Sequence, residues 1–591
     1  MKSERNEVFL ERIFLVFYIV VFLFIIKLIN LQIFNYSKFF KLSERNRIRI
    51  IPRNAPRGNV ITSDGILVAT NRVSYSVMYF PSDNTDERYL SKISSTLEKI
   101  CEIKKERIFE IIRQSAKTLK PSKLIERIDI KRIKNVYEIK NIFPEVEIVE
   151  ESIRNYPFGA YLSHVIGYVG KIDERDVKRY LMKGYSLDSL VGKNGVELYY
   201  EDFLKGKNGG LFMEVDNRGR LVKVIGYESG EKGSDVYLTI NWRSQKAAEE
   251  ALRKLPYKRA AAVACEADSG RIIVYAVKPG YDPNFFVRYS TDNIEQEVDE
   301  FNIPIQGLYP PASTFKIFVT IAALESGKVD ENKKFLCPGY YDAGNRVFKC
   351  WEKKGHGLID MVDGLAKSCD VYYYNVGEIT GPYEIESIAR RFRLDQKTLI
   401  DMPYEKVSII VGPKKRIETK GYWYRGDTIN MSIGQGELLV TPIAMMSAMM
   451  ALANGGKFYQ PFYVDRVVKD DGSVIKHNEP KVLGNIELKK HTWDLIYTAM
   501  RKVVTNGTGR LADVDGVEVF GKTGTAQNPH GKDHAWFVGF AKKEGSKPIA
   551  FAIIVEHGEH GSSSAAPVAR EIIKSYYNVM VKNESLGGII E

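Results

Sequence analysis

The sequence lacks several features that would each point to a distinct class of protein. No strong internal repeat runs through its 591 residues, and its basic residues are not interleaved with aromatics in a recognisable nucleic-acid-binding module. Nucleic acid is therefore rejected as a partner despite a formal net charge of +12. The apolar and charged fractions, 44% and 27%, are ordinary for globular proteins, which argues against wholesale disorder. A chain of this length allows about three to four domains.

A long hydrophobic run near the N-terminus is not followed by a small-x-small cleavage site. Residues 13–26 carry no charge, and extending the run to Leu31 gives about 28 Å of helix, enough to span a bilayer. The sequence therefore predicts an uncleaved anchor over 13–33 and not a removed signal peptide. A buried core helix is the alternative. It is disfavoured because the run is terminal and apolar all round.

Charge around this run gives a conflicting indication of orientation. Seven Lys or Arg and one Glu lie between Lys38 and Arg57, whereas residues 1–12 hold three basic and three acidic residues. The basic cluster is typical of a membrane surface. The positive-inside rule would place the large C-terminal part in the cytoplasm, although large domains translocate with little regard for such counts.

Two regions that differ in their sequence pattern follow the anchor. Residues 34–235 contain turn-punctuated, strand-like runs and a charge-rich lobe over 85–150 with helical periodicity, which is typical of a spacer or docking region. From about Gly233, a strand and a helix precede two strands joined at Ser269-Gly270. Helix-rich sequence continues to about 510, and three strands and a helix over 565–581 close the chain. This order predicts one antiparallel sheet closed by both ends of the domain.

Ser313 and Lys316 stand three residues apart where a helix is expected to begin. Pro310 and Pro311 cannot continue a preceding helix, and the apolar run after Lys316 predicts a helix up to Gly327. Side chains at this spacing face the same way. A neutral lysine amine at a helix start can accept the serine hydroxyl proton and so create a nucleophile. Alone, Ser-x-x-Lys is a weak signal.

Two further groups follow in order: Ser368-Cys369-Asp370, and Lys522-Thr523-Gly524 with Thr525 after it. The three-part set is a known signature of penicillin-binding proteins and β-lactamases. The sequence resembles class B penicillin-binding proteins, specifically the elongation-type (penicillin-binding protein 2) branch, over nearly the whole chain. Further similar segments are Arg57-Gly58, Asp64-Gly65, residues 424–442, GKTGTAQ, DHAWFVGFA and EHGEHGSSSAAPVAR.

The resemblance implies an α+β multidomain protein. It would comprise a cytoplasmic tail (1–12), a transmembrane anchor (13–33), an elongated periplasmic pedestal of the dimerisation type (34–235) and a transpeptidase domain (236–591). The last would have the penicillin-recognising, β-lactamase-like serine enzyme fold, with a five-stranded antiparallel sheet between helices. The implied location is the inner membrane with the catalytic domain in the periplasm, which overrules the charge count.

The resemblance also implies roles in cross-linking peptidoglycan stem peptides. Ser313 would attack the D-Ala–D-Ala carbonyl, with Lys316 as base and Ser368 as proton relay to the leaving amine. β-Lactams would acylate the same serine. No organic cofactor is implied. With lysine already serving as base, a triad through His534 and Asp533 is disfavoured.

The third group would bind the substrate. Lys522 and Thr523 would hold its terminal carboxylate, and Gly524 would leave room along the strand edge. Backbone N–H groups of Ser313 and Thr525 would form the oxyanion hole. Asp370 stands where many relatives have Asn, although elongation-type members often carry Asp. The alternative is that it merely caps the following helix.

Of the five cysteines, Cys101 and Cys265 are isolated. Cys337, Cys350, His356 and Cys369 lie within the catalytic insertion, and Cys369 should point back into the protein if its two neighbours face the substrate. Three thiolates and one imidazole could form a closed, structural zinc site. Some elongation-type relatives resemble this arrangement with mixed Asp, His and Cys ligands. A Cys337–Cys350 disulfide or unlinked thiols are the alternatives.

No glycosyltransferase acid cluster is recognisable before Gly233, so polymerisation would come from a partner. The resemblance implies a polytopic SEDS-type glycosyltransferase and a periplasmic scaffold protein.

Three competing functions fit the sequence less well. A septal transpeptidase is disfavoured by residues 426–442. A penicillin sensor would need a cytoplasmic signalling domain. A β-lactamase would need a deacylating water base and normally a cleaved leader.

Overall fold

A computed structural model describes residues 2–579 apart from 83, 102, 129, 187–188, 217–220, 289–297 and 345. Its contacts define two compact units. The first unit comprises 1–56, 72–153 and 206–232, and the second comprises 57–71, 154–205 and 233–591. Segments 57–71 and 154–205, expected in the pedestal, therefore pack with the transpeptidase segment.

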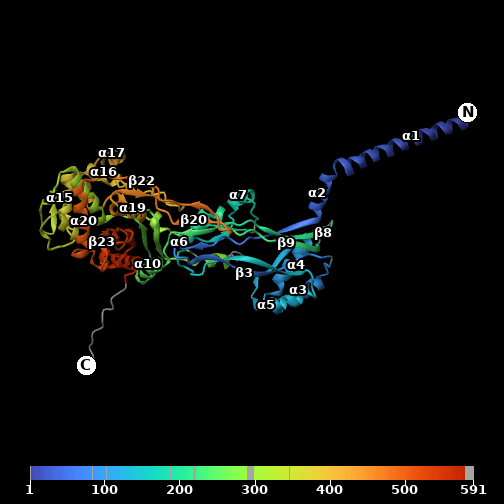
Figure 1. The fold of residues 1–591 in the computed structure, drawn as a ribbon, viewed down its shortest axis with the longest axis horizontal. Coiled ribbons are helices and arrows are strands. Elements are labelled where there is room, and N and C mark those ends of the chain that lie inside the picture. The colour runs from blue at the N-terminus through green and yellow to red at the C-terminus, as the bar shows by residue number, and fades with distance from the viewer. Residues whose placement is uncertain are drawn as a thin grey trace, which may run out of the picture. The chain divides into compact units, whose positions relative to one another are not determined.

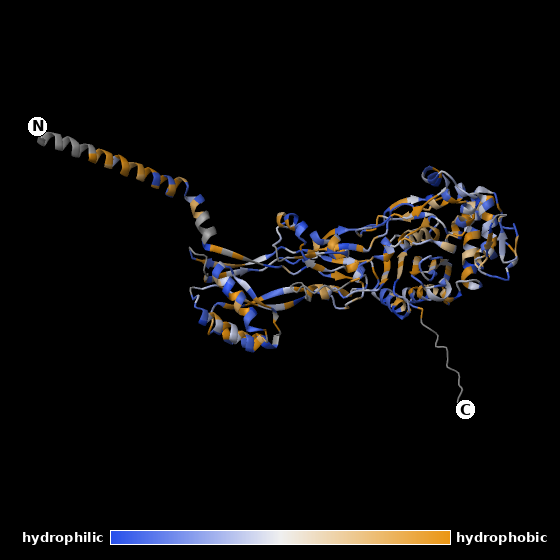
Figure 2. Cartoon of the chain, turned by 180° about the vertical axis from the view of Figure 1, so that it is seen from behind, coloured by the Kyte–Doolittle hydropathy of each residue, from blue (hydrophilic) through white to orange (hydrophobic). Residues whose placement is uncertain are grey.

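The first unit begins with a long apolar helix, α1 (Lys2–Ile29), which continues as a π-helical stretch, Asn30–Phe34, before α2 (Tyr36–Arg47). Ile13–Phe34 is long and apolar enough to cross a membrane, with a mean hydropathy of 2.7. Side chains over 13–26 are exposed, so this run is not a buried core helix. Figure 2 shows the apolar run along α1 in orange.

The charged lobe contains the helices that its periodicity predicts. α3 (Glu87–Cys101) and α4 (Lys105–Thr118) pack beside α5 (Ile130–Lys140), and their apolar faces form one core with strands β3 (Leu67–Tyr79), β4 (Ser122–Ile128) and β5 (Val146–Asn155). Cys101 is buried in this core. A separate three-stranded sheet in this unit has the order β1 (Ile48–Arg53), β8 (Gly209–Val215), β9 (Leu221–Glu228).

A five-stranded antiparallel sheet organises the second unit (Figure 1). Its order is β12 (Ile272–Lys278), β11 (Ala260–Glu266), β25 (Ile549–Val555), β24 (His534–Lys542), β23 (Glu518–Ala526). The two strands of the hairpin and the last three strands of the chain therefore meet in one sheet, as predicted. Gly270, with φ of +79°, turns the β11–β12 hairpin, and Cys265 is buried within β11.

Helices cover both faces of this sheet. Alternate residues of β25, from Ile549 to Val555, share a core with α10 (Trp242–Lys254) and α22 (Ala566–Tyr576). The residues between them are also buried, and the wholly buried α19 (Pro442–Ala453) packs against β25 and β24. Burial on both faces explains why the strands are almost continuously apolar. The last helix ends at Tyr576, earlier than predicted, and residues 580–581 lie outside the described part.

Segments that precede the sheet in the chain also join the second unit. β2 (Val60–Ile61) pairs with β10 (Asp235–Leu238), and Arg57 forms ion pairs of 2.7 Å with both Glu197 and Glu201. A Cβ on Gly58 would lie 1.8 Å from the carbonyl oxygen of Ser234, so only glycine fits there. This packing gives a physical reason for the Arg57-Gly58 signature.

Candidate active site

The nucleophile candidate lies in a 3₁₀ turn, Ala312–Phe315, directly before α13 (Lys316–Ser326). Helix α13 ends at Gly327, whose φ is +68°, as predicted. Residues i and i+3 eclipse in a 3₁₀ turn, which keeps Ser313 and Lys316 on one side. Ala312, with φ of +49°, is held by its N–H, which donates to Gly434 O at 2.8 Å.

Lys316 is fully buried and joins the first motif to the second. Its Nζ donates to Asp370 Oδ1 at 2.7 Å, to Ser368 O at 2.9 Å and to Ser368 Oγ at 3.4 Å. An ammonium group has three hydrogens, and these contacts give each one an acceptor. The Lys316–Asp370 pair compensates a charge that would otherwise be costly to bury.

Asp370 is not the helix cap that the alternative reading proposed. It is the first residue of α15 (Asp370–Thr380), and Cys369 is the N-cap, with Sγ accepting the Tyr372 N–H at 3.4 Å. The second Asp370 oxygen accepts the backbone N–H of Trp351 at 3.0 Å. Asp370 therefore binds Lys316 and the Trp351 N–H, while the preceding cysteine caps the helix.

The third motif lies on β23, the strand that ends the sheet order. Lys522 is fully buried and its Nζ donates to Thr523 O at 3.0 Å. Burial lowers the pKa of Lys522 well below its ordinary value, the positive charge of Lys316 lowers it further, and Asp370 opposes both effects. Lys522 therefore interacts electrostatically with one residue from each of the other two motifs.

Gly524 allows β23 to approach the nucleophile turn closely. A Cβ there would lie 3.0 Å from Thr314 Cγ2 and 3.3 Å from Pro311 O. The close contact is with the protein's own turn, whereas room for substrate at Gly524 and the oxyanion role of Thr525 stay predictions. Next to it, Thr523 Oγ1 shares a 2.6 Å hydrogen bond with Thr508 Oγ1, a residue that no sequence motif marked.

His534 and Asp533 do not form a triad with the nucleophile among the interactions of the described residues. His534 Nδ1 accepts the His557 N–H at 3.1 Å, and its ring packs against Tyr309 at 5.4 Å between centroids. Burial lowers the pKa of His534. Asp533 instead accepts from the Asn528 N–H through Oδ1.

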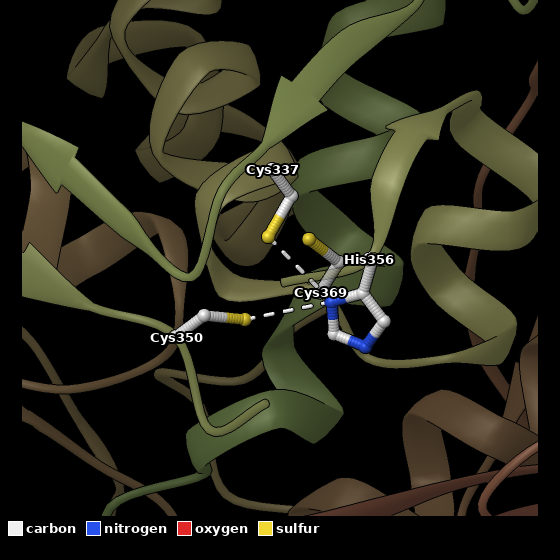
Figure 3. A group of neighbouring side chains, drawn as sticks. All are labelled: Cys337, Cys350, His356 and Cys369. Carbon is white, nitrogen blue, oxygen red and sulfur yellow. Dashed lines mark hydrogen bonds between the residues drawn. The ribbon is translucent and has the colours of Figure 1, made fainter. Parts of the chain in front are cut away.

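The four predicted metal ligands converge from separate strands and loops (Figure 3). Cys337 ends β13 (Phe335–Cys337), Cys350 follows β15 (Val347–Lys349), His356 precedes β16 (Gly357–Ile359) and Cys369 caps α15. Their ligand atoms all lie within 4.8 Å of one another, and His356 Nδ1 is 3.6 Å from both Cys337 Sγ and Cys350 Sγ. All five cysteines of the chain are free thiols, so no Cys337–Cys350 disulfide is formed.

The donor set of the cluster, three thiols and one imidazole, is one that tetrahedral zinc sites use. Zn–S and Zn–N bonds of about 2.3 and 2.0 Å place neighbouring ligand atoms about 3.6 Å apart. The two sulfur–nitrogen distances match this value. A hydrogen bond from the Cys369 thiol lowers the pKa of the Cys350 thiol, while the same contact raises the pKa of Cys369.

A turn that carries Ser313 ahead of Lys316, packed against a Lys-Thr-Gly edge strand, with a Ser-x-Asp group bonded to the lysine, is the motif arrangement of penicillin-recognising serine enzymes. Two family models match the chain: the penicillin binding protein transpeptidase domain over residues 260–574, and the penicillin-binding protein dimerisation domain over 52–238. The chain belongs to the penicillin-binding protein transpeptidase family, which confirms the resemblance and the fold class.

Individual relatives cover almost the whole chain. Peptidoglycan D,D-transpeptidase MrdA of Acinetobacter baumannii is 33% identical over 94% of this chain and 85% of its own length. The penicillin-binding protein 2 of Helicobacter pylori, solved in complex with MreC, is 25% identical with a TM-score of 0.73, covering 90% of this chain and 99% of that one. A chain from a peptidoglycan synthase complex that coordinates polymerization and crosslinking is 26% identical with a TM-score of 0.72, covering 97% and 99%.

Proposed function

We propose that this chain is a peptidoglycan D,D-transpeptidase that cross-links stem peptides through an acyl-serine intermediate during cell elongation. The observation that carries the proposal is the meeting at Lys316 of Ser368 and Asp370 beside the buried Lys522. The 33% identical relative that carries the D,D-transpeptidase name supports it.

In the proposed acylation step, Lys316 acts as the neutral amine, which has a lone pair, and accepts the proton of Ser313 as Oγ attacks the carbonyl carbon of the penultimate D-Ala. The C–N bond then breaks, and the terminal D-Ala leaves as an amine with the proton passed through Ser368 Oγ, 3.4 Å from Lys316 Nζ. Lys522 and Thr523 hold the terminal carboxylate, and the N–H groups of Ser313 and Thr525 stabilise the oxyanion.

In the second step, an amine of a neighbouring stem peptide attacks the acyl carbonyl carbon. The C–N bond of the cross-link forms, the C–O ester bond to Ser313 breaks, and the proton of the amine returns to Ser313 Oγ. A β-lactam enters the first step in the same way and leaves Ser313 acylated. This chemistry requires no organic cofactor.

Fluorescent penicillin labelling tests the assignment of nucleophile and base. Ser313→Ala should abolish covalent labelling, and Lys316→Ala should slow it by at least about 10³-fold because the base is lost. Ser326→Ala, at the far end of the same helix, should label like the unaltered protein. Persistent labelling of Ser313→Ala, or wild-type rates for Lys316→Ala, would overturn the assignment.

The cluster of Cys337, Cys350, His356 and Cys369 is proposed to hold a structural zinc ion. Its four side chains leave no open position, so zinc would brace the loop and not activate a nucleophile. Purified protein should contain close to one equivalent of zinc, and Cys337→Ser should lose it whereas Cys265→Ser, in the sheet, should not. Less than roughly 0.2 equivalents would refute the proposal.

The chain is proposed to be anchored in the inner membrane by residues 13–33, with 1–12 in the cytoplasm and the pedestal (34–235) and transpeptidase (236–591) in the periplasm. Its proposed partners are a SEDS-type glycosyltransferase and a periplasmic scaffold protein. The MreC complex and the synthase complex of related proteins support both. Co-purification, with cross-linking assayed with and without the glycosyltransferase, tests this arrangement.

A further inference from the structure

Trp351 contacts the two groups to which Lys316 donates most closely. Its indole Nε1 lies 3.1 Å from the carbonyl oxygens of both Lys367 and Ser368, and its backbone N–H donates to Asp370 Oδ2 at 3.0 Å. Lys316 Nζ donates to the same Ser368 carbonyl and to the other oxygen of Asp370. One residue, Trp351, therefore donates to both of the closest acceptors of Lys316.

The Ser368 carbonyl needs such support because its residue has an unfavourable backbone conformation. The φ of Ser368 is +56°, in the left-handed region, which is unfavourable for a residue other than glycine. Such a conformation persists only where its surroundings hold it. The indole N–H of Trp351 and the side chain of Lys316 both donate to the carbonyl oxygen of this residue.

Trp351 is itself held by the Cys/His cluster. It directly follows Cys350, and its ring packs edge-on to His356 at 5.3 Å between centroids. Of the four residues in the cluster, only Cys369 belongs to one of the three motifs. Trp351 therefore provides a second connection between the cluster and Lys316: it runs from Cys350 and His356 to the Ser368 carbonyl and the Asp370 carboxylate, whereas the first runs through Cys369.

We propose that Trp351 is a positioning residue for the acylation step: it fixes the Ser368 carbonyl and the Asp370 carboxylate around Lys316 and transmits the order of the cluster to that lysine. The inference rests on the proposed function, in which Lys316 takes the proton from Ser313. Trp351 acts through these acceptors and needs no contact with the substrate.

The test is Trp351→Phe in the full-length protein, because phenylalanine keeps a ring beside His356 and the backbone N–H but removes the indole donor. Single-turnover acylation by a fluorescent penicillin, measured over a range of concentrations, separates the saturating rate constant from the dissociation constant of the noncovalent complex. The rate constant should fall about tenfold, as for loss of one positioning hydrogen bond. The dissociation constant should change less than about twofold because Lys522 and Thr523 are untouched.

Trp493→Phe, which alters a tryptophan beside Tyr497 on α20 (Lys490–Thr505), is the matched control and should acylate like the unaltered protein. Reactive thiols and the thermal midpoint are measured on each variant. An unchanged acylation rate constant in Trp351→Phe overturns the inference. So does a fall accompanied by weaker binding or newly reactive cysteines, which would mean general loss of structure. Failure of the unaltered protein to label at Ser313 would instead refute the proposed function.

Discussion

At the scale of single residues, Lys522 combines a functional position with a costly environment. Its side chain is fully buried, and burial and Lys316 both lower its pKa. Asp370, the acid that opposes this, is already paired with Lys316 at 2.7 Å. A buried lysine that is difficult to protonate is typical of a site that binds an anion. The negative charge of the bound ligand then stabilises the protonated lysine.

We therefore expect Lys522→Met to raise the free energy of unfolding by about 1 kcal/mol while reducing penicillin labelling by at least tenfold. Denaturant unfolding and labelling kinetics on the same sample measure both effects. Lys542→Met, which alters a half-buried lysine among Tyr497, Phe520 and Phe540, is the control and should retain labelling. A destabilised Lys522→Met protein would contradict the expected sign.

At the scale of secondary-structure elements, the nucleophile turn depends on a loop more than one hundred residues away. Gly434 follows α18 (Arg425–Ser432), has φ of +71° and accepts the Ala312 N–H through its carbonyl. A Cβ on Gly434 would lie 2.2 Å from Ala312 O and 2.6 Å from Phe315 Cβ. The loop therefore sets the position of the turn that carries Ser313.

Gly434→Ala should slow acylation of Ser313 by at least tenfold, since the clash displaces the turn and small misplacements are costly in catalysis. Gly436→Ala is a matched control: its φ of +84° carries similar backbone strain, but its Cβ would meet nothing closer than Asn430 Cβ at 3.8 Å. Acylation rates of the two variants measure the difference. Equal acylation rates in the two variants would show that backbone strain, and not the clash with Ala312 and Phe315, slows the reaction.

At the scale of the whole second unit, Asp401 joins segments that are far apart in the chain. It accepts the Tyr200 hydroxyl at 2.9 Å and the backbone N–H groups of Tyr463 and Val464. Burial raises the pKa of Asp401 to about 6, against which these hydrogen bonds act. Above that pH the folded protein holds a buried carboxylate, whereas below it the group is neutral.

The raised pKa means that the folded state binds the proton more tightly than the unfolded state. This contribution to stability is full below about pH 4 and is lost as pH rises through 6, amounting to about 2–3 kcal/mol. Asp401→Asn should remove it, so that the unfolding midpoint of the variant depends less on pH between 4 and 7. Glu249, whose pKa burial raises to about 7, retains a slope of the same sign. An unchanged pH dependence in Asp401→Asn would refute this account.

Prediction from sequence succeeded where a pattern is local or a motif is complete. Alternating and continuous apolar runs indicated the strands of the five-stranded sheet, and the Pro310-Pro311 and Gly327 boundaries placed α13. The convergence of Cys337, Cys350, His356 and Cys369 was also predicted, because residue types limit which side chains group together. The sequence did not predict that residues 154–205 pack with the second unit, since no local periodicity encodes which core a segment joins.

By itself, the sequence determined the apolar helix, the succession of two and then three strands along the chain, and the identity of the three motifs, since these depend on residue type and spacing along the chain. Only the tertiary structure decided what surrounds Lys316. Its contacts with Ser368 and Asp370 span 52 and 54 residues, and Trp351 reaches the same groups from a third segment. Contacts across such separations form only when the whole unit closes, so chain spacing cannot specify them.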